Sequence, residues 1–109
     1  MTMISFSYAA PDVVFHLDAY VLALTEGPKP TIPDIMPLLE AFAEAPGNSM
    51  GGCLHIVLED GNTENEHVQW CVDHAIEKGD ELGAAVAKVM LAMSRTQRRK
   101  LCRIWENLA

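Results

Sequence analysis

Three helix boundaries in the second half of the chain restrict most strongly what this sequence can fold into. A Thr-x-x-Glu run begins at Thr63 and a Ser-x-x-Gln run begins at Ser94, and both have the spacing of a capping box at a helix start. Between them, Gly79 suits the end of one helix and Asp80 the start of the next. Joints this short favour helical hairpins or sharp corners. The sequence therefore predicts helices over residues 64–78, 81–93 and 95–108.

Apolar side chains recur at helical spacing along the last two of these segments. A helix that packs on others needs such a stripe. The stripes consist of Leu82, Val86, Val89, Met90 and Met93 in the first, and of Leu101, Ile104, Trp105 and Leu108 in the second.

The first half carries two further helix patterns. One begins at Pro11 and ends before the stiff, proline-rich stretch that starts at Gly27. In the second pattern, we expect Asp34 to be the capping residue and Pro37 to lie in the first turn, with the helix ending before Pro46.

Residues 53–58, CLHIVL, fit either a short strand or a helix. As a helix, the segment is capped by Ser49 and presents Met50, Leu54, Val57 and Leu58 on one side. We favour the helix, because a lone strand would have no partner in a chain that is otherwise helical.

The predicted fold class is all-α, a small compact bundle of about five to six short helices in a single domain over residues 1–109. Half of the residues are hydrophobic, which is enough for a modest core without disulfide or metal staples. The alternative is an α+β fold with residues 53–58 as a strand.

The chain has none of the sequence marks of a membrane or secreted protein. It has no apolar run of about 18 residues, and its start lacks the basic and apolar regions of a secretory signal. Its three cysteines contain no CxxC pair, which indicates reduced thiols. We therefore expect a cytoplasmic protein that does not bind membranes.

The octapeptide HVQWCVDH, residues 67–74, places two different faces on one predicted helix. Val68, Val72, Ala75 and Ile76 cluster on one side, whereas His67, Trp70, His74 and Lys78 lie on the adjoining and opposite sides. A tryptophan opposite an apolar stripe is a candidate contact with a foreign partner. For this ring alone, packing within the fold or in a homodimer is favoured over contact with a foreign partner.

The same octapeptide contains metal-ligand residue types. His67 and Cys71, or Cys71 and His74, could share an ion, but the two histidines lie about 10 Å apart along a helix axis. No fourth ligand has a standard spacing, and no third group orients Cys71 as a nucleophile. We predict neither a metal or other cofactor nor an enzyme; the alternative is a zinc- or thiol-dependent protein centred on these three residues.

Charge divides the chain in two. Residues 1–94 carry 14 acidic side chains against three lysines, a formal charge of −11, whereas residues 95–109 carry +4. This tail predicts a basic patch, for which structural use is favoured and direct nucleic-acid binding is not expected. The alternative is a DNA-associated regulator that uses this patch, which consists of Arg95, Arg98, Arg99, Lys100 and Arg103.

The run PGNSMGGCLHIVLEDGNTENEHVQWC, followed by GDELG and MSRTQRRKL, resembles a group of short proteins from phages, prophages and bacterial mobile elements. The resemblance covers roughly the second half of the chain. It implies a genomic setting rather than a chemistry: many small acidic proteins in such settings bind and block a host machine, as anti-CRISPR proteins do. No functional residue carries over from the group.

Together these features predict a small acidic protein-protein interaction module, of the kind that phages use to inhibit a host nucleic-acid-handling complex. An acidic surface can occupy basic grooves that normally hold phosphate. The candidate partner-binding residues are Glu64, Glu66, His67, Trp70, Asp73, His74 and Glu77.

Overall fold

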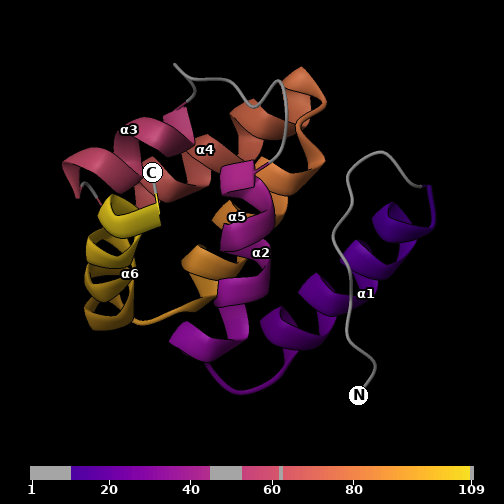
Figure 1. The fold of residues 1–109 in the computed structure, drawn as a ribbon, viewed down its shortest axis with the longest axis horizontal. Coiled ribbons are helices and arrows are strands. Elements are labelled where there is room, and N and C mark those ends of the chain that lie inside the picture. The colour runs from indigo at the N-terminus through magenta and orange to yellow at the C-terminus, as the bar shows by residue number, and fades with distance from the viewer. Residues whose placement is uncertain (1–10, 45–52, 62, 109) are drawn as a thin grey trace.

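Six α-helices make up the regular structure of the described chain (Figure 1). The computed structural model describes residues 11–44, 53–61 and 63–108. None of these residues is in a strand, and none of the helices that they form is long and apolar enough to cross a membrane. The helices are α1 (Pro11–Glu26), α2 (Ile32–Glu44), α3 (Cys53–Asp60), α4 (Asn65–Lys78), α5 (Glu81–Ala92) and α6 (Arg95–Leu108).

Helix α5 is the centre of the fold. It packs on α4, α1 and α2, while α6 packs on α3 and α2. The predicted stripe on α5 is buried along its whole length, and the small residues between its members are buried too. Helix α5 is therefore apolar almost all round. One core contains side chains from all six helices, and the all-α prediction is confirmed.

The joint between α4 and α5 forms as the sequence predicts. Gly79 has φ +75°, a left-handed conformation that glycine adopts without strain. The next residue, Asp80, accepts a hydrogen bond at its Oδ1 from the Gly83 N–H at 2.9 Å and so caps α5. Likewise, the Ser94 Oγ accepts a bond from the Gln97 N–H at 3.2 Å at the start of α6.

Two predicted caps are wrong. Asp34 does not cap α2, which begins at Ile32; instead, the Asp34 Oδ2 accepts a hydrogen bond from the Thr31 N–H at 2.8 Å. In return, the Thr31 carbonyl accepts bonds from the N–H groups of Asp34 and Ile35. Thr31 and Asp34 thus satisfy each other's backbone three residues apart, and the helix starts earlier than predicted.

The second wrong cap is Thr63. The N-cap of α4 is Glu64, which makes no side-chain cap hydrogen bond, and Thr63 is buried one position earlier. The physical reason lies outside the local sequence: the Thr63 carbonyl accepts a hydrogen bond from a side chain of α6, as described below.

Residues 53–58 lie in α3, so the α+β alternative is wrong. Leu54, Val57 and Leu58 are buried where α3 meets α4 and α6. The helix ends at Gly61, whose φ is +72° and whose N–H donates to the Val57 carbonyl at 2.9 Å. The predicted cap Ser49 and the stripe residue Met50 lie outside the described residues.

Candidate functional site

The exposed side of α4 carries the predicted partner-binding residues, and we call it the α4 outer face. Four of its residues have spacings of four, three and four and so form a single stripe along the helix: Glu66, Trp70, Asp73 and Glu77. The side chains of all members are exposed except that of His74, which is half-buried. The members are Glu64, Glu66, His67, Trp70, Asp73, His74 and Glu77.

Packing of α4 decides which side becomes this face. Its inner side buries Val68, Cys71, Val72 and Ala75, all of them small or β-branched. Trp70 points the other way, and 57% of its surface is exposed. Ile76, which the periodicity places with the core stripe, is also exposed.

Neighbouring side chains hold the groups of the α4 outer face in defined positions. The Trp70 ring stacks on the His74 ring with centroids 5.2 Å apart and planes 19° apart. The Gln69 Nε2 donates to the Asp73 Oδ1 at 3.2 Å. Because these contacts join residues one turn apart, the helix itself orders the face before any partner binds.

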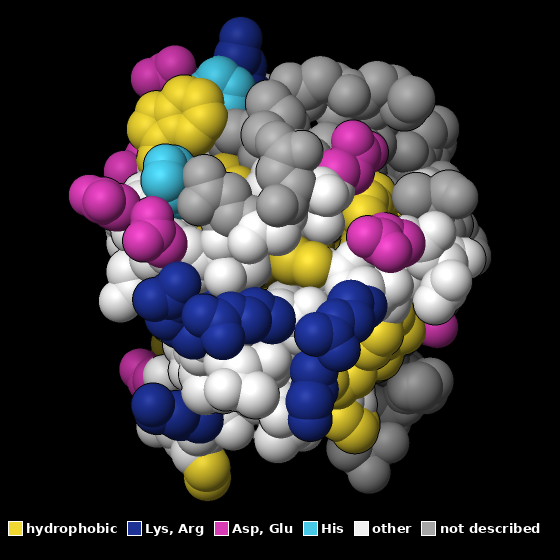
Figure 2. All heavy atoms as spheres, turned by 90° about the vertical axis from the view of Figure 1, so that its left-hand side faces the viewer, with side chains coloured by type: hydrophobic (Ala, Val, Ile, Leu, Met, Phe, Trp, Pro, Cys, Tyr) yellow, Lys and Arg dark blue, Asp and Glu magenta, His cyan; other side chains and the backbone are white. Residues whose placement is uncertain are grey.

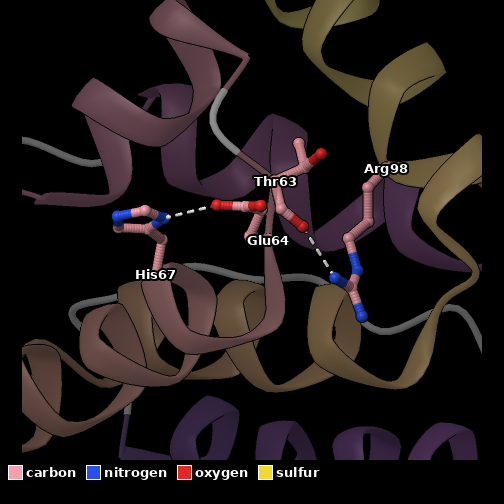
Figure 3. A network of polar contacts seen from close by, with 4 residues as sticks. All are labelled: Thr63, Glu64, His67 and Arg98. Atoms are coloured by element: carbon pink, nitrogen blue, oxygen red, sulfur yellow. Dashed lines mark hydrogen bonds and ion pairs between the residues drawn. The ribbon is translucent and has the colours of Figure 1, made fainter.

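At the start of α4, the Nδ1 of His67 lies 3.7 Å from the Oε1 of Glu64 (Figure 3). Glu66 precedes Trp70 along the same stripe, and Asp73 and Glu77 follow it, so exposed carboxylates flank a large aromatic ring with an indole N–H donor. Such a surface suits a cationic partner, since Arg and Lys can pair with the carboxylates and lie over the ring.

The three candidate metal ligands do not come together. Cys71 is fully buried on the inner side of α4, whereas His67 is exposed on the outer side. Over the part of the chain that the structure describes, no group of three His, Cys, Asp or Glu side chains is placed to hold a metal ion. The alternative of a zinc site therefore has no geometric support among these residues.

Cys102 is a second buried thiol, on α6. Burial, and then the charge of Glu106, raises the pKa of this thiol above its ordinary value. The thiol can donate to the Val57 carbonyl, with 3.8 Å between the sulfur and the oxygen. A protonated, buried thiol with this contact is a packing group rather than a nucleophile.

Helix α6 carries a basic surface, which we call the α6 basic face. Figure 2 shows Lys and Arg side chains in a band across one side of the molecule, beside a cluster of acidic, histidine and hydrophobic side chains. Acidic and basic surfaces thus lie next to each other. The α6 basic face consists of Arg95, Arg99, Lys100 and Arg103, all of them exposed.

Arg98 does not belong to this surface, which corrects the sequence-based grouping. Only 3% of its surface is exposed, and its guanidinium reaches into the molecule (Figure 3). It donates from Nε to the Met90 carbonyl at 2.6 Å, from Nη2 to the Leu91 carbonyl at 2.9 Å and from Nη1 to the Thr63 carbonyl at 2.7 Å.

Two of these acceptors explain why a cation is tolerated there. Met90 and Leu91 lie in the last turn of α5, at the negative end of the helix dipole. The Met90 carbonyl also accepts a hydrogen bond from the Met93 N–H at 3.0 Å, so the guanidinium is a second donor to it. Burial, and then the charge of Arg95, lowers the pKa of Arg98 from its ordinary value. The guanidinium thus joins the end of α5 to Thr63, the residue before the N-cap of α4. It thereby places the α6 basic face near the start of the α4 outer face.

A signal for this burial was present in the sequence. Arg98 stands three residues before Leu101 and seven before Trp105, so it falls on the same stripe as these core residues. The sequence-based grouping took all five cations together by charge and so missed that Arg98 lies on the core side of the helix.

Comparison with known proteins adds no family to this description: no family model, no curated protein and no solved structure matches the chain.

Proposed function

We propose that this protein is a small protein-binding module whose α4 outer face binds a basic surface of another protein. The observation that carries the proposal is the exposure of Trp70, stacked on His74 among carboxylates. A large exposed aromatic side chain with low conformational freedom is typical of interface hot spots. Its acidic surroundings favour a partner rich in Lys and Arg.

The class of partner follows from the charge. A formal charge of −7 lets the protein compete with phosphates for a groove that normally holds nucleic acid. Occupation of that groove would inhibit a host nucleic-acid-handling complex. The resemblance of the second half to short phage proteins points to the same class of target.

The test is affinity capture from a bacterial host lysate, followed by competition with nucleic acid. We expect the tagged protein to capture a nucleic-acid-binding complex at low salt, and added nucleic acid to release it. Trp70→Ala should weaken binding to the purified partner by about tenfold or more, as expected of a hot-spot residue. Glu66→Lys, Asp73→Lys and Glu77→Lys together should abolish it.

A matched charge reversal provides the control. Glu26, Glu40 and Glu59 are also exposed but lie on α1, α2 and α3, so their replacement by Lys changes the net charge equally. If this control variant loses binding as much as the α4 variant, the attraction is due to net charge, and the proposed face is wrong. Unchanged binding by the Trp70 variant would also contradict the proposal.

A second candidate function, DNA binding, rests on the four adjacent exposed cations of the α6 basic face. It predicts an affinity for duplex DNA that falls steeply with salt and is lost in the Arg99→Ala, Arg103→Ala double variant. Absence of DNA binding at low salt would remove this candidate.

A further inference from the structure

A groove lies on another part of the molecule, where α1 faces the hairpin of α4 and α5. Its volume is about 710 Å³. Both α1 and α4 pack on α5, which supplies the buried floor residues Ala84 and Ala85. Because these floor side chains are methyl groups, the surface of α5 is low between the two walls.

Two helices present regular stripes to this groove. On α1, Asp18 and Thr25 are the first and last of four lining residues with the spacing i, i+3, i+4, i+7. On α5, Glu81 and Lys88 are the ends of a stripe with the same spacing. Each stripe covers two turns, or about 10 Å, which is the pattern that a helix presents to a neighbouring helix.

Large apolar side chains are exposed to solvent on the walls of the groove. Leu22 on α1 is 55% exposed and Ile76 on α4 is 58% exposed, and both line the groove. Only Trp70 joins them as an exposed large hydrophobic residue over the described part of the chain. Two of these three side chains therefore border one hollow, which is a mark of an interaction site.

The two ends of the groove differ in charge. A second hollow of about 440 Å³ shares Thr25 and Lys88 with the groove, so these two residues mark one end. Asp18 and Glu81 lie two turns earlier on their helices and mark the other end, together with Asp80. One end is thus acidic and the other basic.

We propose that this groove docks an amphipathic helix of a partner protein. The partner helix contributes about two turns of apolar stripe, with Lys or Arg at the end that meets Asp18 and Glu81, and an acidic side chain near Lys88. Its apolar side chains cover Leu22 and Ile76. The α4 outer face takes no part, so this inference stands apart from the proposed function.

The test uses three labelled, acetylated and amidated helical peptides. The first carries a leucine stripe with Lys in one terminal turn and Glu in the other; the second carries Glu in both terminal turns; the third carries Ser in place of the stripe. We expect the first to bind with a Kd in the micromolar range, and the other two to bind about tenfold more weakly or worse. Amide chemical shifts should change at groove residues.

Variants of the protein locate the site. Leu22→Ser with Ile76→Ser should weaken binding of the first peptide by about tenfold or more, whereas the equally exposed Trp70→Ser should leave it unchanged. Asp18→Lys with Glu81→Lys should reverse the preference, so that the peptide with Glu in both terminal turns binds more tightly than the first.

Three results would overturn the inference. One is failure of the leucine-stripe peptides to bind the wild-type protein. Another is an equal loss of binding in the Trp70→Ser variant. The third is a concentration-dependent dimer that the Leu22→Ser, Ile76→Ser variant abolishes, since the occupant of the groove would then be a second copy of this chain.

Discussion

Helices α4 and α6 each have 14 residues and one tryptophan, but the two rings lie in opposite environments. Trp105 on α6 is 2% exposed and contacts Phe42 with ring centroids 5.8 Å apart, whereas Trp70 on α4 is 57% exposed. In α6 the large ring belongs to the core stripe, and the cations other than Arg98 face outward. In α4 smaller side chains complete the core contact, so the fold does not need the ring of Trp70.

Replacement of Trp105 should have the largest effect. Trp105→Ala removes a buried aromatic side chain and leaves a cavity beside Phe42, so the free energy of unfolding should fall by about 3 to 5 kcal/mol. Urea denaturation followed by circular dichroism measures the change. Trp70→Ala is the matched variant; if both substitutions cost the same, the contrast between the two helices is wrong.

Arg98 gives the next largest effect within α6. Arg98→Ala removes three charge-assisted hydrogen bonds from a buried side chain to backbone carbonyls, so we expect the free energy of unfolding to fall by about 3 kcal/mol. The neighbouring Arg99→Ala should cost less than about 0.5 kcal/mol, because that side chain is exposed. Equal midpoints of urea denaturation for the two variants would contradict the buried role of Arg98.

The buried thiol of Cys102 on α6 should give a smaller effect, a dependence of stability on pH. Because burial raises the pKa of the Cys102 thiol, the folded protein holds its proton more tightly than the unfolded chain does. This contribution to stability is complete below the thiol's pKa in the unfolded chain, about 8.5, and is lost as pH rises through the higher folded value.

Denaturation at pH values from about 7 to 10 measures the loss; Tyr20, whose pKa is also raised by burial and by Asp34, ionises at higher pH. The Cys102→Ala variant should show a shallower decline over this range. A decline as steep as that of the wild type would assign the pH dependence to other groups.

Replacement of Trp70 should have the smallest effect on stability and the clearest optical one. Trp70→Phe should change the free energy of unfolding by less than about 0.5 kcal/mol, as is usual at an exposed position. The fluorescence of the Trp70→Phe variant should be blue-shifted and resistant to quenching by iodide, because only the buried Trp105 remains. Emission that iodide still quenches strongly would mean that Trp105 is accessible.

Sequence patterns located the helices better than their capping residues. The prediction of a helix over residues 64–78 was right although its cap at Thr63 was wrong. Amphipathic periodicity extends over the whole segment, whereas a cap depends on the position of a single residue, and Thr63 is held by the hydrogen bond from Arg98 to its carbonyl. The same periodicity predicted that Trp70 lies off the core stripe, but whether another element covers the ring was left open. The groove beside Leu22 and Ile76 could not be predicted, since its two walls come from helices far apart in the chain.

What the sequence by itself determined was the local structure: where α5 and α6 begin, and which sides of them face the core. Gly79, Asp80 and Ser94 act within a few residues of themselves, so their hydrogen bonds can be inferred from spacing alone. Only the tertiary structure decided the role of Arg98. Its acceptors lie 7, 8 and 35 residues away in the chain, and a cation is stable in the core only where packing brings such carbonyls together.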